Sequence, residues 1–314
     1  MRDKKCSIVV SVFNEEAVIQ QFHEELRHNI DSIDYTMEII YVNDGSCDGS
    51  DKKLDHIAAD DSRVKVLHFS RNFGHEAAMT AGIDYACGDV IICMDSDLQN
   101  PPALLNDMLQ ACEGGNDIVT MVRVDREDGG LYKRVTSRIF YRIINHLSDM
   151  QLQPNASDFF LITKPVADVL RKDFREKTRF MRGFVQIVGF HKTSISYRAP
   201  RRAAGESKYS FRKLVHFALS SMASFSKIPL KIGIYSGVMF GLLSLALIIY
   251  SVIMWIVNRP VGGYTTLIIF LSAFAAISLI VIGIIGYYIG FILDEVKGRP
   301  IYVVERITTS GNER

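Results

Sequence analysis

Short apolar runs alternate with longer amphipathic segments through the first part of the chain. Five runs rich in Val, Ile and Met predict β-strands: CSIVVSV, MEIIYVN, VKVLHF, DVIICMD and DIVTMV. Between them, apolar positions recur at helical spacing in EEAVIQQFHEELRHNI, GSDKKLDHIAAD, GHEAAMTAGIDYA and PALLNDMLQAC. This alternation predicts an α/β fold, in which right-handed crossovers build a mostly parallel sheet covered by helices. Ligands are then expected beyond the carboxyl ends of the strands.

A different pattern fills the last third of the chain. Residues 232–257 and 265–293 are apolar runs without a single Asp, Glu, Lys or Arg. Each exceeds the roughly 20 residues that cross a bilayer as a helix, so the pattern predicts two transmembrane helices. The link NRPVGGY is short and rich in turn formers, which favours an antiparallel hairpin.

Basic residues beside the two apolar runs predict the orientation of the hairpin. They precede the first run and follow the second, and the link holds only one: Lys227 and Lys231, Lys297 and Arg299, and Arg259. Because Lys and Arg are enriched in cytoplasmic loops, both ends are expected in the cytoplasm. We therefore expect a multi-pass protein of the inner (plasma) membrane whose α/β domain lies in the cytoplasm.

Glycines recur at four-residue spacing in both apolar runs. This spacing lets helices approach closely and favours a homo-oligomer, although glycine is also simply common in membrane helices. The positions are Gly233, Gly237, Gly241, Gly286 and Gly290.

The segment before the hairpin, YSFRKLVHFALSSMASFS, has apolar residues at i, i+3, i+4 and i+7. This spacing fits a helix in the lipid headgroup region. A core-packed helix has the same pattern, but the adjoining hairpin favours the membrane. The predicted organisation is therefore an α/β domain, an interface helix, two membrane helices and a cytoplasmic tail, over residues 1–208, 209–229, 230–294 and 295–314.

Composition narrows the class of function. The formal net charge of +1 lacks the basic excess of a general nucleic-acid binder, so no nucleic-acid partner is expected. The N-terminal apolar run is too short for a signal peptide, so we expect the hairpin to deliver the chain to the membrane. Five cysteines at spacings unlike any zinc motif indicate reduced thiols: Cys6, Cys47, Cys87, Cys93 and Cys112.

Acidic turns follow the first two predicted strands. The turn FNEE (13–16) is not Gly-rich, so a dinucleotide-binding site loses its main support, and Asn14 could simply cap the next helix. The turn NDGSCDGS (43–50) carries Asp44, which suits a contact to a base or ribose. An Asx-type turn that caps a helix explains the same residues.

The turn after the fourth strand carries two carboxylates, Asp95 and Asp97. Carboxylates at a buried strand end are costly unless a cation or another partner compensates them. Oxygen ligands favour Mg²⁺ or Mn²⁺, with a diphosphate filling the remaining positions. The tripeptide Asp95-Ser96-Asp97 could also belong to a solvated loop, but the neighbouring acidic turns favour a metal site.

Together these turns resemble those of family 2 glycosyltransferases of the GT-A fold. The narrower likeness is to the dolichol-phosphate mannose synthase-like branch, which includes bacterial undecaprenyl-phosphate glucosyltransferases. The matching segments are VVSVFNEE, IIYVNDGSCDGS, FSRNFGHEAAMTAGIDYACGDVIICMDSDLQNPP, SDFFL, RFMRGF and RRAAGESKYSFRKL, and the hairpin also matches. The resemblance implies a Rossmann-like GT-A sheet and metal-dependent transfer of one sugar from a nucleotide sugar to a polyisoprenyl phosphate.

The resemblance also implies roles for donor-side residues. The nucleotide would be held by Phe13, Glu15, Asp44 and Asp95. The metal and diphosphate would be held by Asp95, Asp97 and Gln99. Residues 11–13 are Ser-Val-Phe where the family often has Pro-Val-Tyr, so a tyrosine hydroxyl contact is missing, and Asn100 replaces an acidic residue.

On the acceptor side, Asp158 lies where the branch places its proposed base, and we count it with Asp97 as catalytic. A structural role, capping or pairing with Arg182, is the alternative. Phe160 replaces the usual arginine of Asp-Phe-Arg, which puts the binding of the acceptor phosphate in doubt. Contacts to the acceptor or diphosphate are expected from Arg202, Lys208, Arg123 and Lys133.

The acceptor chemistry needs little proton abstraction, since a phosphate monoester has its second pKa at about 6. In-line attack by the lipid phosphate would invert the anomeric configuration. We therefore favour orientation of the acceptor over base catalysis for Asp158. Residues 200–208 hold small residues and no apolar anchor, and we expect them to close over the substrates like a lid. His75 and Glu76 open a helix and are expected simply to cap it.

Other functions fit the sequence less well. A processive polysaccharide synthase carries Gln-x-x-Arg-Trp in its soluble domain, whereas the only tryptophan here, Trp255, lies in an apolar run. A non-catalytic nucleotide-sugar-binding membrane anchor is the alternative from a different class, against which the intact Asp95 and Asp97 pair argues. UDP-glucose is the favoured donor, followed by UDP-N-acetylhexosamine and GDP-mannose.

Overall fold

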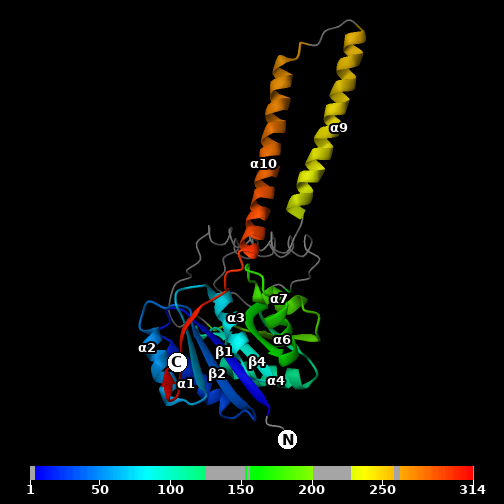
Figure 1. The fold of residues 1–314 in the computed structure, drawn as a ribbon. Helices are drawn as coiled ribbons and strands as arrows, with labels where there is room; N and C mark the ends of the chain where they lie inside the picture. The colour runs from blue at the N-terminus through cyan, green and yellow to red at the C-terminus, as the bar shows by residue number, and fades with distance from the viewer. Residues whose placement is uncertain (1–3, 125–152, 154–155, 201–227, 258–261, 314) are drawn as a thin grey trace. The chain divides into compact units, whose positions relative to one another are not determined.

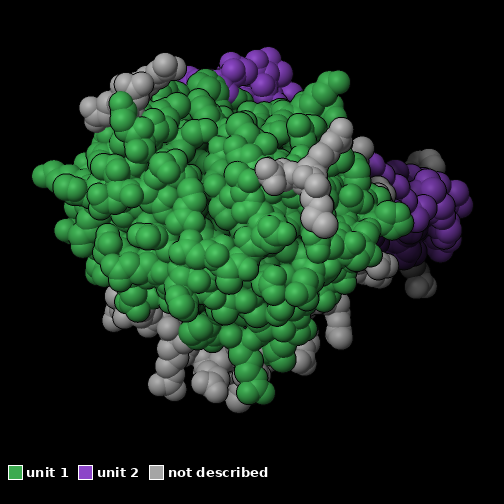
Figure 2. Space-filling model, turned by 90° about the horizontal axis from the view of Figure 1, so that it is seen from below, with its two compact units in different colours: residues 1–143, 150–214, 300–314 green, residues 144–149, 215–299 purple. Residues whose placement is uncertain are grey.

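The computed structural model describes residues 4–124, 153, 156–200, 228–257 and 262–313 (Figure 1). The chain divides into two compact units, coloured separately in Figure 2. Unit 1 comprises residues 1–143, 150–214 and 300–314, and unit 2 comprises residues 144–149 and 215–299.

The described part of unit 1 is built on one mixed nine-stranded sheet, in the order β7-β5-β6-β4-β1-β2-β3-β8-β9. Its centre, β4-β1-β2-β3, is parallel, whereas β6 and β8 run antiparallel to their neighbours β4 and β3. The strands are β1 Lys5–Val12, β2 Thr36–Asn43, β3 Val64–Phe69, β4 Val90–Asp95, β5 Ile118–Arg123, β6 Ala156–Thr163, β7 Lys192–Tyr197, β8 Val304–Thr309 and β9 Asn312–Glu313.

Helices alternate with these strands along the chain, as the apolar pattern predicts. They are α1 Ile19–Ile30, α2 Ser50–Asp60, α3 His75–Tyr85, α4 Leu105–Glu113, α6 Lys164–Lys172 and α7 Met181–Ile187, with a short 3₁₀ turn at Pro102–Leu104. The four predicted helices and five predicted strands all form, which confirms the α/β class.

The core lies where the apolar faces of the helices meet the central strands. Phe22 and Leu26 of α1 are fully buried, as are Ile8 and Val10 of β1 and Ile39 of β2. Strands covered on both sides are rich in apolar residues, which explains why the sequence predicts them so clearly.

Residues 295–314, predicted to be a tail, instead return to the sheet. Val304–Thr309 forms β8, which pairs with β3 along Lys65↔Thr309 to His68↔Arg306. The segment VERITT is partly exposed, and four of its six residues are polar, so it lacks the apolar signature of the central strands. Consequently, the chain before the apolar hairpin and the chain after it fold into the same unit.

Unit 2 contains two long apolar helices, α9 Ile228–Ile256 and α10 Tyr264–Val296 (Figure 1). Their stretches Gly233–Met254 and Ile269–Val296, with mean hydropathies of 2.3 and 2.6, are long and apolar enough to cross a membrane. Gly233 allows close packing between them, since an added Cβ would lie 2.9 Å from Val281 Cγ1.

The remaining glycines of the predicted packing motif do not contact the neighbouring helix. A Cβ added at any of them would meet no atom within 4 Å: Gly237, Gly241, Gly286 and Gly290. A role for these four in a homo-oligomer stays a prediction. The predicted interface helix over 209–229 lies, apart from its last residues, outside the described residues, as does the boundary at 208.

The packing of α3 on β1 requires a glycine at position 82. A Cβ there would lie 2.0 Å from Cγ1 of the fully buried Val9. We predict that Gly82→Ala lowers the free energy of unfolding by about 1–3 kcal/mol, because the core has no room for an added methyl group. Thermal unfolding of the purified protein measures the loss.

The control is the double variant Val9→Ala, Gly82→Ala. It should be less destabilised than the sum of the two single variants, because the shortened side chain removes the clash. Full additivity would show that the two positions are not in contact.

Candidate active site at the carboxyl edge of the sheet

Three acidic turns meet at one edge of the sheet. Val12 of β1 pairs with Asn43 of β2, and Ser11 of β1 pairs with Asp95 of β4, all in parallel register. The turns that follow these strands therefore begin side by side. This is the edge at which doubly wound sheets bind their ligands.

Asp158 is brought to the same edge by β6. Cys93 of β4 pairs with Phe160, and two further steps along these antiparallel strands lead to Asp95 and Asp158. Arg182 of α7 binds Asp158 with two donors: Nε donates to Oδ1 at 3.0 Å, and Nη2 donates to Oδ2. The structure therefore contains the Asp158–Arg182 pair considered in the sequence analysis.

His75, at the start of α3, lies between the two aspartates. Its Nδ1 is 3.0 Å from Ser11 Oγ and 3.6 Å from Asp95 Oδ1, and its Nε2 is 3.8 Å from Asp158 Oδ2. Ser11 Oγ donates to Asp95 Oδ1 at 3.2 Å. When His75 is protonated, it can donate to Ser11 while Ser11 donates to Asp95, so the three groups form a continuous chain.

The charges in this cluster shift each other's pKa values. Burial alone would lower the pKa of His75, but the nearby Asp95, Asp158 and Glu76 outweigh it and raise that pKa. Burial opposes ionisation of Asp158, yet Arg182 and His75 hold its pKa below the usual range. Burial, together with the negative charge of Asp158, raises the pKa of Glu76 to about 7. At neutral pH, Asp158 is thus ionised and ion-paired.

Asp44 lies under the loop that follows β3. Its carboxylate accepts hydrogen bonds from the backbone N–H groups of Phe73 (2.6 Å) and Gly74 (3.0 Å) and from Asn72 Nδ2 (2.8 Å). Burial raises the pKa of Asp44, which these amides offset in part. Asp44 therefore fixes loop 70–74, and any contact to a nucleotide would share its oxygens with that loop.

The turn after β1 is joined to the turn after β2. Asn14 has a φ of 54°; its N–H donates to Ser46 Oγ, and its Oδ1 accepts from the N–H of Cys47. The N–H of Glu15 donates to Ser50 Oγ at 2.9 Å. Phe13, which precedes them, is 37% exposed.

The Asp95–Asp97 turn is held by hydrogen bonds and by Arg123. The N–H of Gln99 donates to Asp97 Oδ1 at 3.0 Å. Arg123 donates to Gln99 Oε1 at 3.3 Å and to the hydroxyl of Tyr197 at 2.9 Å. The oxygen through which Gln99 would bind a metal therefore already accepts from a guanidinium.

The turn after β4 offers two carboxylates, Asp95 and Asp97, to a metal. Among the described residues, no three His, Cys, Asp or Glu side chains are grouped closely enough to hold an ion by themselves. Two carboxylates at one strand end nevertheless suit a hard divalent cation that takes its other oxygens from a diphosphate. The residues present therefore fit a metal that binds together with the nucleotide.

Three predicted phosphate contacts, Lys133, Arg202 and Lys208, lie outside the described residues. Of the predicted residues that are described, the structure brings Asp95 and Asp158 to His75, and Gln99 to Arg123. Asp44, Phe13 and Glu15 lie on the adjoining turns of the same edge.

Comparison with known proteins identifies the family. The model of glycosyl transferase family 2 matches residues 7–170, more than half of the chain. This chain is a family 2 glycosyltransferase. The matched region runs from β1 to α6 and includes all three acidic turns and Asp158.

The glycosyltransferase is also similar to relatives over nearly its whole length. It is 37% identical over 311 residues to the uncharacterized glycosyltransferase YkcC of Bacillus subtilis (strain 168). This match covers 98% of this chain and 95% of the relative. It is 36% identical over 303 residues to the SfII prophage-derived bactoprenol glucosyl transferase of Shigella flexneri, covering 96% of this chain and 98% of the relative.

Among solved structures, glucosyl-3-phosphoglycerate synthase from Mycobacterium tuberculosis, in complex with Mn²⁺, UDP and phosphoglyceric acid, is similar at 17% identity. The match covers 70% of this chain and 76% of that one, with a TM-score of 0.47.

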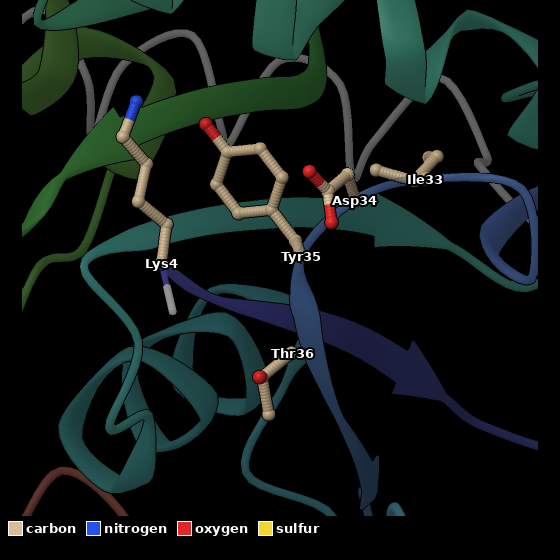
Figure 3. Close-up of a pocket in the computed structure, with 5 residues that line it drawn as sticks. All are labelled: Lys4, Ile33, Asp34, Tyr35 and Thr36. Atoms are coloured by element: carbon tan, nitrogen blue, oxygen red, sulfur yellow. The ribbon is translucent and has the colours of Figure 1, made fainter. Parts of the chain in front are cut away.

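A hollow elsewhere on unit 1 of the glycosyltransferase is lined by Lys4, Ile33, Asp34, Tyr35 and Thr36 (Figure 3). Lys4 precedes β1 and Thr36 begins β2, so the hollow lies at the amino edge of the sheet. It is at the opposite ends of the strands from the acidic turns, and we assign it no role in transfer.

Sequence reasoning did not find His75 as a member of the site, and it considered Arg182 only as a structural partner of Asp158. His75 was expected only to cap a helix, and no side-chain cap bond is formed at the start of α3. Glu76 instead reaches across to α7, where its Oε2 accepts from the N–H of Met181 at 2.7 Å. An isolated histidine carries no local signal of a partner 83 residues away, such as Asp158.

The raised pKa of Glu76 predicts a pH-dependent stability. A carboxyl group whose pKa is higher in the folded state favours folding while protonated, so its ionisation destabilises the fold as pH rises from about 4.5 to 7. We predict that Glu76→Gln is more stable than the wild type at pH 8, by about 1–2 kcal/mol, with little difference at pH 5. Denaturant unfolding at the two pH values measures this.

Glu38→Gln serves as the opposite-sign control. Although burial opposes ionisation of Glu38, hydrogen bonds from Ser7 and Cys87 and the charge of Lys65 lower its pKa. Its stabilisation is present above the unfolded pKa and is lost as pH falls, so this variant should be destabilised at pH 8 and less so in acid. Equal pH profiles for Glu76→Gln and the wild type would contradict the assignment for Glu76.

Proposed function

We propose that this glycosyltransferase transfers glucose, with inversion, from UDP-glucose to undecaprenyl phosphate or a similar polyisoprenyl phosphate at the cytoplasmic face of the membrane. The observation that carries the proposal is the extent of the similarity to bactoprenol glucosyl transferases. It covers 96% of this chain, and so includes the apolar hairpin as well as the catalytic unit. The product would be a lipid-linked sugar for cell-envelope glycans such as O-antigen.

The donor would lie along the carboxyl edge. We assign Phe13, Glu15 and Asp44 to the nucleotide, Asp44 through the loop that it holds. A divalent cation, Mg²⁺ or Mn²⁺, would bind Asp95 and Asp97 with the diphosphate, and would neutralise the charge that develops on the leaving group. Gln99 joins this set only if Arg123 releases its side-chain oxygen.

The acceptor phosphate would approach Asp158. Because Asp158 is ion-paired to Arg182 and its pKa is low, it is a weak base. The nucleophile is already ionised at neutral pH, since its second pKa is about 6. The contacts therefore favour orientation: Asp158 holds Arg182 at the reacting edge, where a guanidinium suits a phosphate. Arg123, Lys133, Arg202 and Lys208 are proposed as further phosphate contacts.

The path of the chain supports the proposed membrane topology. Residues on both sides of the hairpin belong to unit 1, which supports the proposal that the two ends of the hairpin lie on the same side of the membrane. The placement of Lys and Arg favours the cytoplasmic side. The interface helix over 209–229 would then hold the catalytic unit near the lipid acceptor.

A donor screen with undecaprenyl phosphate tests the sugar. Membranes containing the protein are incubated with radiolabelled UDP-glucose, UDP-N-acetylglucosamine or GDP-mannose, and the organic-soluble label is counted. We expect UDP-glucose to give the labelled lipid. Labelling from another donor would overturn the sugar assignment, and no labelled lipid from any donor would favour a non-catalytic anchor.

The proposed metal role gives a prediction for Asp97. Asp97→Asn removes one anionic ligand and should lower transfer about a hundredfold or more, with the fold unchanged. Wild-type activity should vanish in excess EDTA and return with Mn²⁺ or Mg²⁺. Asp107→Asn, on the exposed side of α4, is the control and should keep its activity. Full wild-type activity in EDTA would exclude the metal role.

A further inference from the structure

The segment that follows the second apolar helix contacts the elements that carry the donor turns. Residues 302–308 lie along β3, at the side of the sheet away from β4 and β6. The proposed donor residues all precede this segment by more than 200 positions. Two separate sets of contacts nevertheless lead from it to the turns after β1 and β2.

The first set reaches loop 70–74. The ring of Tyr302 stacks on Phe69 at the end of β3, with centroids 5.3 Å apart and planes 9° from parallel. The N–H of Ser70 donates to the carbonyl of Val303 at 3.1 Å. The loop that starts here is the one that covers Asp44. The C-terminal segment therefore fixes the point from which that loop leaves the sheet.

The second set is a chain of side chains that starts at Arg306. Its Nη1 and Nη2 donate to the two oxygens of Asp55 in α2, at 3.0 and 2.8 Å. Thr308 Oγ1 donates to Asp55 at 2.8 Å. Asp55 Oδ1 lies 3.1 Å from Nε2 of the buried His68. Asp55 is thus held between β8 and β3 by charge-assisted bonds.

The chain continues from His68 to the donor turn. With the proton on Nε2 facing Asp55, Nδ1 of His68 accepts from Asn43 Nδ2 at 3.1 Å. Asn43 Oδ1 then accepts from the N–H of Ser46 at 3.0 Å, which closes the turn that carries Asp44. Burial and the nearby Arg306 lower the pKa of His68, which keeps it in the neutral form that this pattern requires.

The far end of the chain reaches the turn after β1 as well, because Ser46 Oγ accepts from the N–H of Asn14. Every donor and acceptor along this path is compatible with a single tautomer of His68. The path therefore fixes which way the side-chain amide of Asn43 faces. An Asn at a strand end without these partners would not have a fixed orientation.

We propose that Arg306 is a positioning residue of the nucleotide site, acting through Asp55, His68 and Asn43 on the turn that carries Asp44. This inference rests on the proposed function, in which that turn binds a uridine nucleotide. According to this inference, β8 contributes to the affinity for the donor nucleotide and does not contribute to the affinity for the acceptor lipid.

The test measures donor binding directly. Calorimetric titration of the full-length protein in detergent with UDP and Mn²⁺ gives the dissociation constant. We expect Arg306→Gln to weaken UDP binding about tenfold, because hydrogen bonds to charged groups are the strong ones. The KM for undecaprenyl phosphate should stay unchanged. Thr308→Val keeps the side-chain volume, removes one donor to Asp55 and should give a smaller loss in the same direction.

Arg63→Gln is a matched control at the other end of β3. Arg63 binds Asp61 at 2.7 Å and Asp31 at 2.8 Å, and its side chain is 29% exposed, against 30% for Arg306. Both substitutions remove a carboxylate-bound arginine next to the same strand, so both should lower the unfolding temperature. Only Arg306→Gln should weaken UDP binding.

The outcomes distinguish a failure of the inference about Arg306 from a failure of the proposed function. Equal UDP affinity in the wild type, Arg306→Gln and Thr308→Val would overturn the inference and leave the proposed function intact. Equal losses in Arg306→Gln and Arg63→Gln would also overturn it, since they would reflect stability alone. A wild-type protein that binds no uridine nucleotide would overturn the proposed donor and the inference with it.

Discussion

The imidazole of His75 is the group around which the site is arranged. Electrostatic interactions connect it with four carboxylates from four different elements of the chain: Asp44, Glu76, Asp95 and Asp158. So many acids at one partly buried edge would repel each other without compensation. Arg182 and protonated His75 supply positive charge, and the backbone N–H groups of Phe73 and Gly74 donate hydrogen bonds to Asp44. A divalent cation that enters with the substrate would compensate the carboxylates that these groups leave unpaired.

Local patterns in the sequence were sufficient for much of this structure. The central strands are buried on both faces and therefore rich in apolar residues, which marks them without any knowledge of their partners. The turns after them could be placed at one edge because parallel strands must end together. Asp44 and Asp95 were found in this way, before any contact was known.

The remaining features depend on partners that are distant in the chain. Arg182 and Asp158 meet because β6 runs antiparallel to β4 and carries Asp158 back to the edge, a topology that no local pattern encodes. Likewise, β8 follows the hairpin and has only two apolar residues among its six, so its pairing with β3 was not predicted. That pairing builds one unit from the chain on both sides of the apolar hairpin.

The central claim is that the carboxyl edge around His75 binds the nucleotide sugar with its cation. A structure determined with UDP-glucose and Mn²⁺ tests it most directly. The account predicts the ion on Asp95 and Asp97, in contact with the diphosphate, and the uracil near Phe13 and the turn that carries Asp44. Nucleotide bound at the amino edge, beside Lys4 and Tyr35, with Asp95 and Asp97 free of metal, would contradict it.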